Sequence, residues 1–589
     1  HRTQPRMKQQ NHLVLSLACW ALLTLAGQAQ QDTLDMDVTF VGKRTMEVRD
    51  AVKLSSWPMA RPLSTEKPTL NYDLLSKRLQ FEPTMTPVEA TRLRVDAYLS
   101  RLYRGHVRAG GGSRGTSLLD ASYTDLRSRE GSWGTSLHHA SIASPSNLLS
   151  GRIHENMFDA WNSRFVGQEK ISFSAHLGQH KTRMFGFDSV FVDSTSMDAT
   201  ALRWRQAGAT LELKSHRKDS TSFNHVLNST FEWLTNNQGL SERHLLGELN
   251  LHRHVWGERL DIGIEAQLDR TQLDTSRAYN QAIVTLNPRL STEKGPWRAA
   301  VGLGVALDAD QPTRDEIGDV VHVYPRAEVS VNLFRNLFVP YAKVGGNLRA
   351  NNLHHVLELN PFFAPDQLDS PVVFNGQTIQ ASGFRSTNKR LAFSGGVRGT
   401  VTQQFRFHGH ASSAQHEDFL LFRPTTVSRD TASYATFEAV YDTVNVRTLG
   451  GEVGLSLGER FDLKGSLTLN SYKLRNEDQA WHLPTLLWDA AVAYQVIEGL
   501  AVQADVQYVG ERYALSKDPN YGNPEPLDNG NYQLALPGYF DVNLTTNYRY
   551  NDRLGAWLTL ANLANTKYSV WGGHPVQGFQ VLGGVQYAF

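Results

Sequence analysis

The sequence is short of cysteine, of long apolar runs and of net charge. Mean hydropathy is −0.38 and 40% of the residues are hydrophobic. These values exclude a bundle of membrane-spanning helices, because each such helix needs about 20 consecutive apolar residues. Lys and Arg number 59 against 58 Asp and Glu, so nothing in the charge balance indicates a nucleic-acid partner.

The one cysteine, Cys19, lies in the single long apolar run, from Leu13 to Ala26. A basic start before this run and small residues after it are typical of a secretory signal peptide. We therefore expect residues 1–29, including the residues upstream of Met7, to be removed after Ala29. An anchor helix and lipidation at Cys19 are the alternatives. Removal would leave no cysteine, which suits an exported bacterial protein that crosses an oxidising periplasm.

From about residue 100 onward, apolar and polar side chains alternate over long stretches. The clearest runs from Phe540 to Tyr550, and similar stretches run from Leu260 to Leu268 and from Phe461 to Leu469. Strands in soluble sandwiches average about six residues, whereas a tilted strand crossing a bilayer needs about 9–11. The stretches are of the longer kind, so they predict membrane-crossing strands with one lipid face and one wet face.

The connections between these stretches alternate in length. Tight polar junctions occur at residues 256–259, 402–404 and 551–553, and long polar excursions occupy residues 350–387, 419–445 and 513–537. Outer-membrane barrels alternate short periplasmic turns with longer external loops in this way. We predict an all-β fold: a closed antiparallel transmembrane barrel of about 22 strands over residues 101–589.

The last residues support the same fold. Val581, Gly583, Val585, Tyr587 and Phe589 share one face of a strand that ends on an aromatic residue. This stretch resembles the closing strand of bacterial outer-membrane proteins, in which the terminal aromatic is read by the barrel assembly machinery. The resemblance assigns barrel closure and the assembly signal to Tyr587 and Phe589.

One further motif carries a family resemblance. Residues 562–568, Asn-Leu-Ala-Asn-Thr-Lys-Tyr, are similar to a stretch that precedes the last loop and strand of TonB-dependent receptors, in a style common among Bacteroidetes. The resemblance implies a bacterial outer-membrane location, contact with outer-membrane lipid, nutrient uptake or ligand binding at long external loops, and TonB or a surface lipoprotein as partner.

The N-terminal part departs from this family. Val38, Thr39, Phe40 and Val41 belong to a stretch that faintly resembles the start of a plug domain and could contact a periplasmic partner. Residues 30–100 are too few for a standard plug and are broken by prolines, so we expect a short irregular periplasmic segment with one short helix near its end. Without a plug, inward-folded loops, this segment or a partner chain must fill so wide a barrel.

Motifs that suggest chemistry have plainer explanations. Residues 454–458 match the Gly-x-Ser-x-Gly pattern of serine hydrolases, but they continue a strand and no helix follows. Residues 110–115 are rich in glycine without the Lys-Ser/Thr pair of a phosphate loop, and a turn is expected there. We therefore predict neither an enzyme nor a bound cofactor.

Histidines recur at strand spacing and are interpreted as residues of the wet face, not as metal ligands. The pairs are His138–His139, His252–His254, His354–His355 and His408–His410, and of these His354–His355 is the better metal candidate because it lies in a long external loop. Trp557, Tyr508, Tyr548 and Tyr550 are expected in the aromatic girdles at the membrane interfaces.

Two functions remain open. The first is a transporter-class barrel that passes or captures a nutrient at its external loops. The alternative is a non-transporting scaffold component of an outer-membrane complex, in which the loops or the N-terminal segment dock another protein. Nothing in the sequence names a substrate.

Overall fold

The computed structural model describes residues 102–589 apart from gaps at 126–129, 143–152, 184–200, 218–221, 238, 274–277, 310–320, 364–370, 375–376, 381–382, 430–431, 459, 517–523 and 528–529. The expected signal peptide, the 30–100 segment with its helix, and Val38, Thr39, Phe40 and Val41 lie outside the described residues. The described residues belong to one compact unit, Arg101–Phe589.

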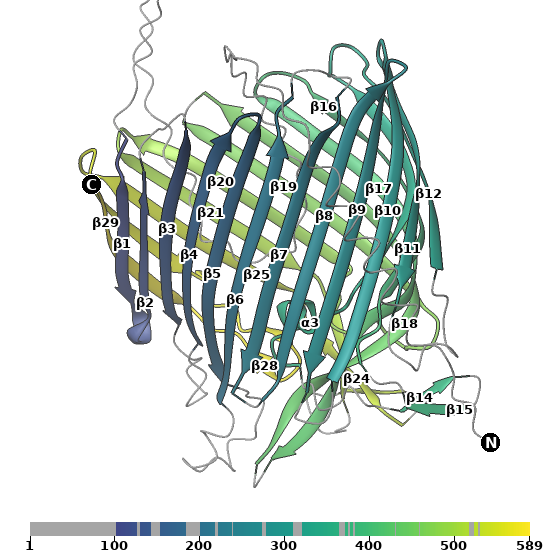
Figure 1. The fold of residues 1–589 in the computed structure, drawn as a ribbon. Helices are drawn as coiled ribbons and strands as arrows, with labels where there is room; N and C mark the ends of the chain where they lie inside the picture. Colours follow the sequence, from purple (N-terminus) through teal and green to yellow (C-terminus); the bar gives the residue numbers. More distant parts are fainter. Residues whose placement is uncertain are drawn as a thin grey trace, which may run out of the picture. The chain divides into compact units, whose positions relative to one another are not determined.

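This unit is a closed antiparallel barrel of 22 strands (Figure 1), which confirms the predicted fold class. Each strand pairs with its neighbours in the ring. The barrel strands are β1 Gly105–Gly112, β2 Ser117–Thr124, β3 Gly131–Ile142, β4 Ile153–Val166, β5 Glu169–Arg183, β6 Ala201–Ser215, β7 Asn224–Asn236, β8 Ser241–Val255, β9 Glu258–Gln272, β10 Ala278–Lys294, β11 Trp297–Asp308, β12 Val321–Val331, β13 Val339–Arg349, β16 Thr387–Thr400, β17 Phe405–Arg429, β18 Ala432–Leu457, β19 Phe461–Leu474, β20 Leu486–Ile497, β21 Leu500–Val509, β25 Tyr539–Arg549, β26 Leu554–Ala561 and β29 Gln580–Ala588.

Shorter elements lie in the connections. They are the 3-10 turn Ser113–Gly115, the helix α3 Leu353–Leu359, and the strands β14 Pro371–Phe374, β15 Gln377–Gln380, β22 Arg512–Ser516, β23 Glu525–Pro526, β24 Tyr532–Leu536, β27 Ser569–Trp571 and β28 His574–Pro575. In the part of the chain that the structure describes, no helix is long and apolar enough to cross a membrane.

The ring closes between the first and last strands. β1 pairs with β29 along its length, from His106 opposite Ala588 to Gly112 opposite Leu582. Gly105 and Phe589 exchange two backbone hydrogen bonds of 2.9 Å. Closure satisfies the backbone groups that an open sheet edge would leave unpaired in lipid.

Side chains alternate between an apolar outer face and a polar lumen, as the sequence predicts. Leu245 and Leu268, which face each other on β8 and β9, are 41% and 45% exposed on the outer face. Their neighbours His244 and Asp269 point into the lumen and pair with each other. The outer face is a belt of exposed leucine, valine and phenylalanine. Exposing so large an apolar surface to water would be unfavourable, so this belt must face lipid.

The two ends of the barrel differ. Connections at the end where the chain terminates are short, as in the two-residue turn of Trp256 and Gly257, whose φ values of 54° and 81° suit a tight hairpin. The helix α3 and the small strands β14, β15, β24 and β28 gather at the opposite end (Figure 1). By the rule for outer-membrane barrels, the first end is periplasmic and the second external.

Two details correct the sequence interpretation. Trp557 was expected in an aromatic girdle, but it is 3% exposed and points into the lumen, where the guanidinium of Arg108 lies 4.0 Å from its ring. Gly110 was expected in a turn, but it belongs to β1 and lies under the Trp557 ring, where a Cβ would come within 2.4 Å of it. Tyr548 and Tyr550 are exposed at the periplasmic rim, as a girdle requires.

Candidate functional site

The external mouth of the barrel is crossed by loops that fold inward from the wall. The longest described connection, between β13 and β16, carries α3. Its N-terminus lies against the lumen face of β8, where both carboxylate oxygens of Glu242 accept hydrogen bonds: Oε2 from the backbone N–H of Leu353 at 2.7 Å and Oε1 from that of His354 at 2.9 Å. The hydroxyl of Thr271 donates to Oε2 at 2.7 Å. Glu242 is 1% exposed, so this carboxylate anchors the helix inside the barrel.

A second anchor lies beside the first. Asn352 caps α3 by accepting a hydrogen bond from the backbone N–H of His355. Its amide donates to Asp269 of β9 at 3.0 Å, and the same carboxylate oxygen lies 2.6 Å from Nδ1 of His244. The start of the helix is therefore fixed to two neighbouring strands of the lumen wall.

The helix also closes an apolar cluster that joins separate parts of the wall. Leu202 and Trp204 of β6 and Leu234 of β7 point into the lumen and contribute to it. β17 and β18 contribute from farther around the ring, and Trp571 packs against the cluster from the connection between β26 and β29. The buried members are Leu202, Trp204, Leu234, Leu240, Leu273, Leu353, Val356, Phe363, Phe384, Leu420, Phe422 and Phe437. Because β6 and β7 lie far from β17 and β18 around the ring, their side chains can belong to one cluster only if the loops between them cross the mouth of the barrel.

Aromatic rings fill the centre of this cluster. The Trp571 ring lies 5.2 Å from Phe437, 5.4 Å from Phe422 and 4.8 Å from His482 between ring centroids. The His574 ring stacks on Phe362 at 4.0 Å. Aromatic rings bury large areas and prefer such edge and stacked contacts, so this centre stabilises the loops beyond their hydrogen bonds.

The connection between β19 and β20 joins the same assembly. Asp442 of β18 is 3% exposed and accepts hydrogen bonds from the backbone N–H groups of Asn476 and Glu477, each at 2.9 Å to its Oδ2. The indole N–H of Trp481 donates to Glu477 at 2.7 Å. The ring of His482 accepts from the backbone N–H of Gly572 at 3.3 Å. Burial lowers the pKa of His482 to about 3, so this imidazole is neutral at physiological pH.

The family motif of residues 562–568 shapes the connection before the last strand. Asn562 has φ of 46° and is 4% exposed. Its amide donates to the carbonyls of Thr566 and Gln577 and accepts from the N–H of Thr566. Tyr568 stacks on Tyr539 with centroids 3.6 Å apart and donates its hydroxyl proton to Asp541. The motif therefore fixes the conformation of the loop that places Trp571 at the mouth of the barrel.

We call this assembly the loop cap: α3, Phe362–Phe363, Trp481–His482, residues 571–574, and the external parts of β17 and β18 that contact them. The cap spans the mouth with described residues of the barrel unit alone. Inward-folded loops, one of the three fillers expected from the sequence, therefore occupy the external end.

The histidine pairs differ in what they can bind. His138 and His139 are adjacent in a strand, so they face opposite sides: His138 contacts Asp120 and His139 contacts Asn156. His354 points toward Glu232, at 3.9 Å, whereas Nδ1 of His355 accepts from Arg349 at 3.0 Å. Neither pair shares one coordination site.

His408 and His410 do share a side of the wall. They lie on the lumen face with Glu452 of β18, and their ligand atoms fall within 4.8 Å of one another. No sequence spacing links Glu452 to the pair, because the register of two long strands brings them together. Ser456 of the Gly-x-Ser-x-Gly stretch donates to Asp462 in the same wall and sits in a continuous strand.

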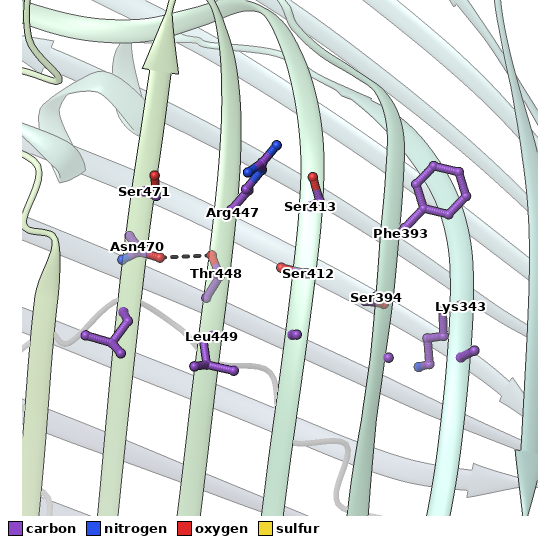
Figure 2. A pocket seen from close by; sticks show the side chains of 14 residues that line it. Lys343, Phe393, Ser394, Ser412, Ser413, Arg447, Thr448, Leu449, Asn470 and Ser471 are labelled. Carbon is purple, nitrogen blue, oxygen red and sulfur yellow. Dashed lines mark hydrogen bonds between the residues drawn. The ribbon is translucent and has the colours of Figure 1, made fainter.

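The outer wall also carries a hollow of about 690 Å³ across β13 to β19. Phe393 and Leu449 line it and are 56% and 57% exposed, while Gly395 and Ala411 leave the space between them. Figure 2 shows Ser413, Arg447 and Ser471 at one level across three strands. Because most of the lining residues belong to the lipid face of their strands, this hollow lies on the outer surface of the barrel and not in the lumen.

The residues assigned to barrel closure lie at the periplasmic rim. Tyr587 is on the outer face of β29 and stacks on Phe589 at 6.1 Å between ring centroids. The Phe589 ring covers Gly105, where a Cβ would come within 2.2 Å of it. The assembly-signal role of Tyr587 and Phe589 stays a prediction.

Known proteins match this chain by fold and not by sequence. No family model matches it, and no curated protein matches its sequence significantly. The FrpB iron transporter from Neisseria meningitidis (F3-3 variant) is 13% identical, with a TM-score of 0.61 over 83% of this chain and 82% of that one. The pyoverdine outer membrane receptor FpvA from Pseudomonas aeruginosa PAO1 is 9% identical, with a TM-score of 0.60 over 83% and 79%. The copper transporter OprC is 13% identical, with a TM-score of 0.58 over 82% and 80%.

At these identities the likeness establishes the fold. The chain is a 22-stranded barrel of the outer-membrane type, with the architecture expected from the resemblance to TonB-dependent receptors. The closed ring and its apolar outer belt place it in a bacterial outer membrane.

Proposed function

We propose that this protein takes up a nutrient across the outer membrane and binds it on the external side of the loop cap. The observation that carries the proposal is the cap itself. Loops from three parts of the wall meet over the mouth through the buried Glu242 anchor and the aromatic centre. The buried hydrogen bonds to Glu242 hold the start of the helix, so a ligand that weakens them would favour an open cap, as a gate requires.

The ligand class we propose is a metal ion or a metal complex. Proteins of the same fold are described as an iron transporter, a pyoverdine receptor and a copper transporter. Trp571 and Tyr568 of the external loops are partly exposed, which leaves aromatic surface for contact with a bulky chelate.

The partners follow from the same proposal. TonB would contact the segment containing Val38, Thr39, Phe40 and Val41, and the barrel assembly machinery would recognise Tyr587 and Phe589. The alternative, a scaffold that binds a surface lipoprotein, is favoured by the β17–β18 hairpin. Its strands have 25 and 26 residues, far more than the about 9–11 that a bilayer needs, so the hairpin extends outside the membrane.

Uptake in cells tests the proposal. We expect a deletion strain to lose uptake of at least one iron chelate or of copper ions, and the wild-type gene to restore it. A variant lacking residues 38–41 should fail to restore uptake if TonB acts there, while still reaching the membrane. Normal uptake of every ligand in the deletion strain, together with co-purification of a stoichiometric partner, would favour the scaffold instead.

A further inference from the structure

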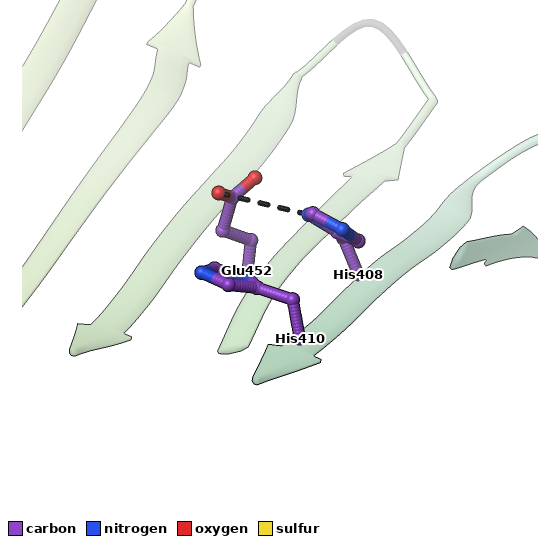
Figure 3. Close-up of side chains that lie close together, drawn as sticks. All are labelled: His408, His410 and Glu452. Carbon is purple, nitrogen blue, oxygen red and sulfur yellow. Dashed lines mark ion pairs between the residues drawn. The ribbon is translucent and has the colours of Figure 1, made fainter. Parts of the chain in front are cut away.

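Three potential metal ligands converge on the lumen face of neighbouring strands. His408 and His410 are two residues apart on β17 and therefore point to the same side. Glu452 of β18 lies directly opposite His408 in the strand register. Figure 3 shows the carboxylate and the two rings side by side. Among the described residues, this is the group of three His, Cys, Asp or Glu side chains close enough to hold one ion.

The environment of His408 orients its ring. Nε2 lies 2.8 Å from the hydroxyl oxygen of Tyr341, and Nδ1 lies 3.8 Å from Oε1 of Glu452. When Nε2–H donates to Tyr341, the lone pair is on Nδ1, the atom that faces the carboxylate. Imidazoles that bind metals are commonly fixed by such a partner on the other ring nitrogen. Tyr341 is thus a positioning residue for the site.

His410 supplies an unused nitrogen. Its Nδ1 is buried without a hydrogen-bond partner, and its ring stacks on His408 with centroids 5.0 Å apart. Buried polar atoms are nearly always satisfied by protein, water or an ion. The donor atoms lie within 4.8 Å of one another, and tetrahedral ligands of one ion lie about 3.3 Å apart, so binding requires side-chain rotations that bring them closer.

We propose that His408, His410 and Glu452 bind one divalent transition-metal ion, Zn²⁺ or Cu²⁺, on the lumen wall. Two imidazoles and one carboxylate form a donor set that suits these ions. Three protein ligands leave at least one coordination position open, so the ion can exchange. Arg398, opposite His408 in the register, adds positive charge nearby and also favours release over permanent retention.

The site lies near the periplasmic end of the lumen, since β17 begins at Phe405. The loop cap lies at the other end. An ion that has passed the cap would therefore meet these ligands before leaving the barrel. The inference does not rest on the proposed uptake, because the binding of the ion can be measured on the purified protein.

Calorimetric titration of the untagged, detergent-purified chain with Zn²⁺ tests the proposal. We expect wild type to bind one more equivalent than the His408→Ala/His410→Ala variant. The matched control is His252→Ala/His254→Ala, which removes another pair of histidines two residues apart from the lumen face of β8 and should bind as wild type does. Glu452→Gln should weaken the site tenfold or more. Equal binding by wild type and the His408→Ala/His410→Ala variant overturns the site.

A second measurement removes the dependence on that variant's folding. Electron paramagnetic resonance of one equivalent of Cu²⁺ should show coupling to two imidazole nitrogens in wild type and in the His252→Ala/His254→Ala control. Tyr341→Phe should keep both nitrogens but shift the spectrum, because the ring of His408 loses its fixed orientation. A wild-type spectrum without coupled imidazole nitrogens would contradict the proposal.

Discussion

At the scale of single residues, the sequence shows which side chains are unusual but not always why. Asn562 belongs to the stretch that carries the family resemblance, and its role is conformational: it adopts a positive φ and ties the two ends of a loop through its amide. Asparagine tolerates this backbone conformation and offers both a donor and an acceptor. The motif of residues 562–568 therefore reflects the conformation that this loop requires.

Trp557 shows where such reasoning fails. An aromatic residue near a strand end suits either an interface girdle or the lumen, and only the register decides between them. Trp557 lies opposite Asn547 on the lumen side of the wall, where it covers Gly110 and contacts Arg108. A turn separates Trp557 from the alternating stretch of residues 540–550. Because the geometry of that turn was not known from the sequence, the alternation in residues 540–550 could not predict which face of the next strand carries Trp557.

Two histidines of the loop cap, His482 and His355, should make the cap sensitive to pH. Burial lowers the pKa of His482 to about 3 and that of His355, with help from Arg349, to about 4. In an open cap both would titrate near 6.5. The closed cap thus keeps its full stability above about pH 6.5 and loses it as the pH falls below that value, because only the open form then takes up protons.

We therefore predict that channel openings in planar bilayers become more frequent between pH 7.5 and pH 5, by up to about tenfold per pH unit per histidine below 6.5. The His482→Gln variant should show a shallower dependence than wild type, and the double variant His482→Gln/His355→Gln a shallower one still. Openings of wild type that are equally frequent at both pH values would contradict this explanation.

At the scale of elements, the strands follow from local alternation and the closing pair from the chain ends. Phe589 requires glycine at position 105, because its ring occupies the space that a side chain at that position would need. Gly111 offers a matched position on the same strand and the same face, where a Cβ would meet only the carbonyl of Thr116 at 3.7 Å.

Gly105→Val should displace the Phe589 ring and slow the closure of β1 against β29. We expect less heat-modifiable barrel in detergent gels for this variant after refolding into lipid, and wild-type amounts for Gly111→Val. If both variants assemble as wild type does, the contact between Gly105 and Phe589 is not needed for closure.

The loop cap could not be predicted as an element. Its key contact joins Glu242 to the backbone of Leu353, 111 residues later, and the apolar cluster draws on β6, α3, β17 and Trp571. Neither contact leaves a periodic signal, since loop packing depends on the closed ring that brings distant connections together. The His408–His410–Glu452 group has the same origin: spacing predicts the pair, and only the register of β17 with β18 adds the carboxylate.

At the scale of the whole molecule, the low mean hydropathy of −0.38 is what a barrel requires. Half of each strand faces a wet lumen and the loops face water, so only the outer belt is apolar. The sequence therefore predicted the architecture well, from period and connection length. The sequence did not predict what fills so wide a barrel. In the structure, the loop cap occupies its external end.

We infer that the loop cap closes the external mouth of the barrel and that Glu242 holds it closed. Replacing Glu242 with alanine leaves the backbone donors of Leu353 and His354 and the hydroxyl of Thr271 without their buried partner, at a cost of about 2–5 kcal/mol to the closed cap. Glu265 of β9 is the matched control, because it lies on the same lumen wall and makes no contact with the cap among the described interactions.

Single-channel recording in planar bilayers at neutral pH tests this most directly. We expect small, rare conductance for wild type and for Glu265→Ala. For Glu242→Ala we expect large openings that are at least about tenfold more frequent, since 1.4 kcal/mol corresponds to a factor of ten. Large stable conductance in wild type, or a Glu242→Ala variant as quiet as wild type, would contradict this inference.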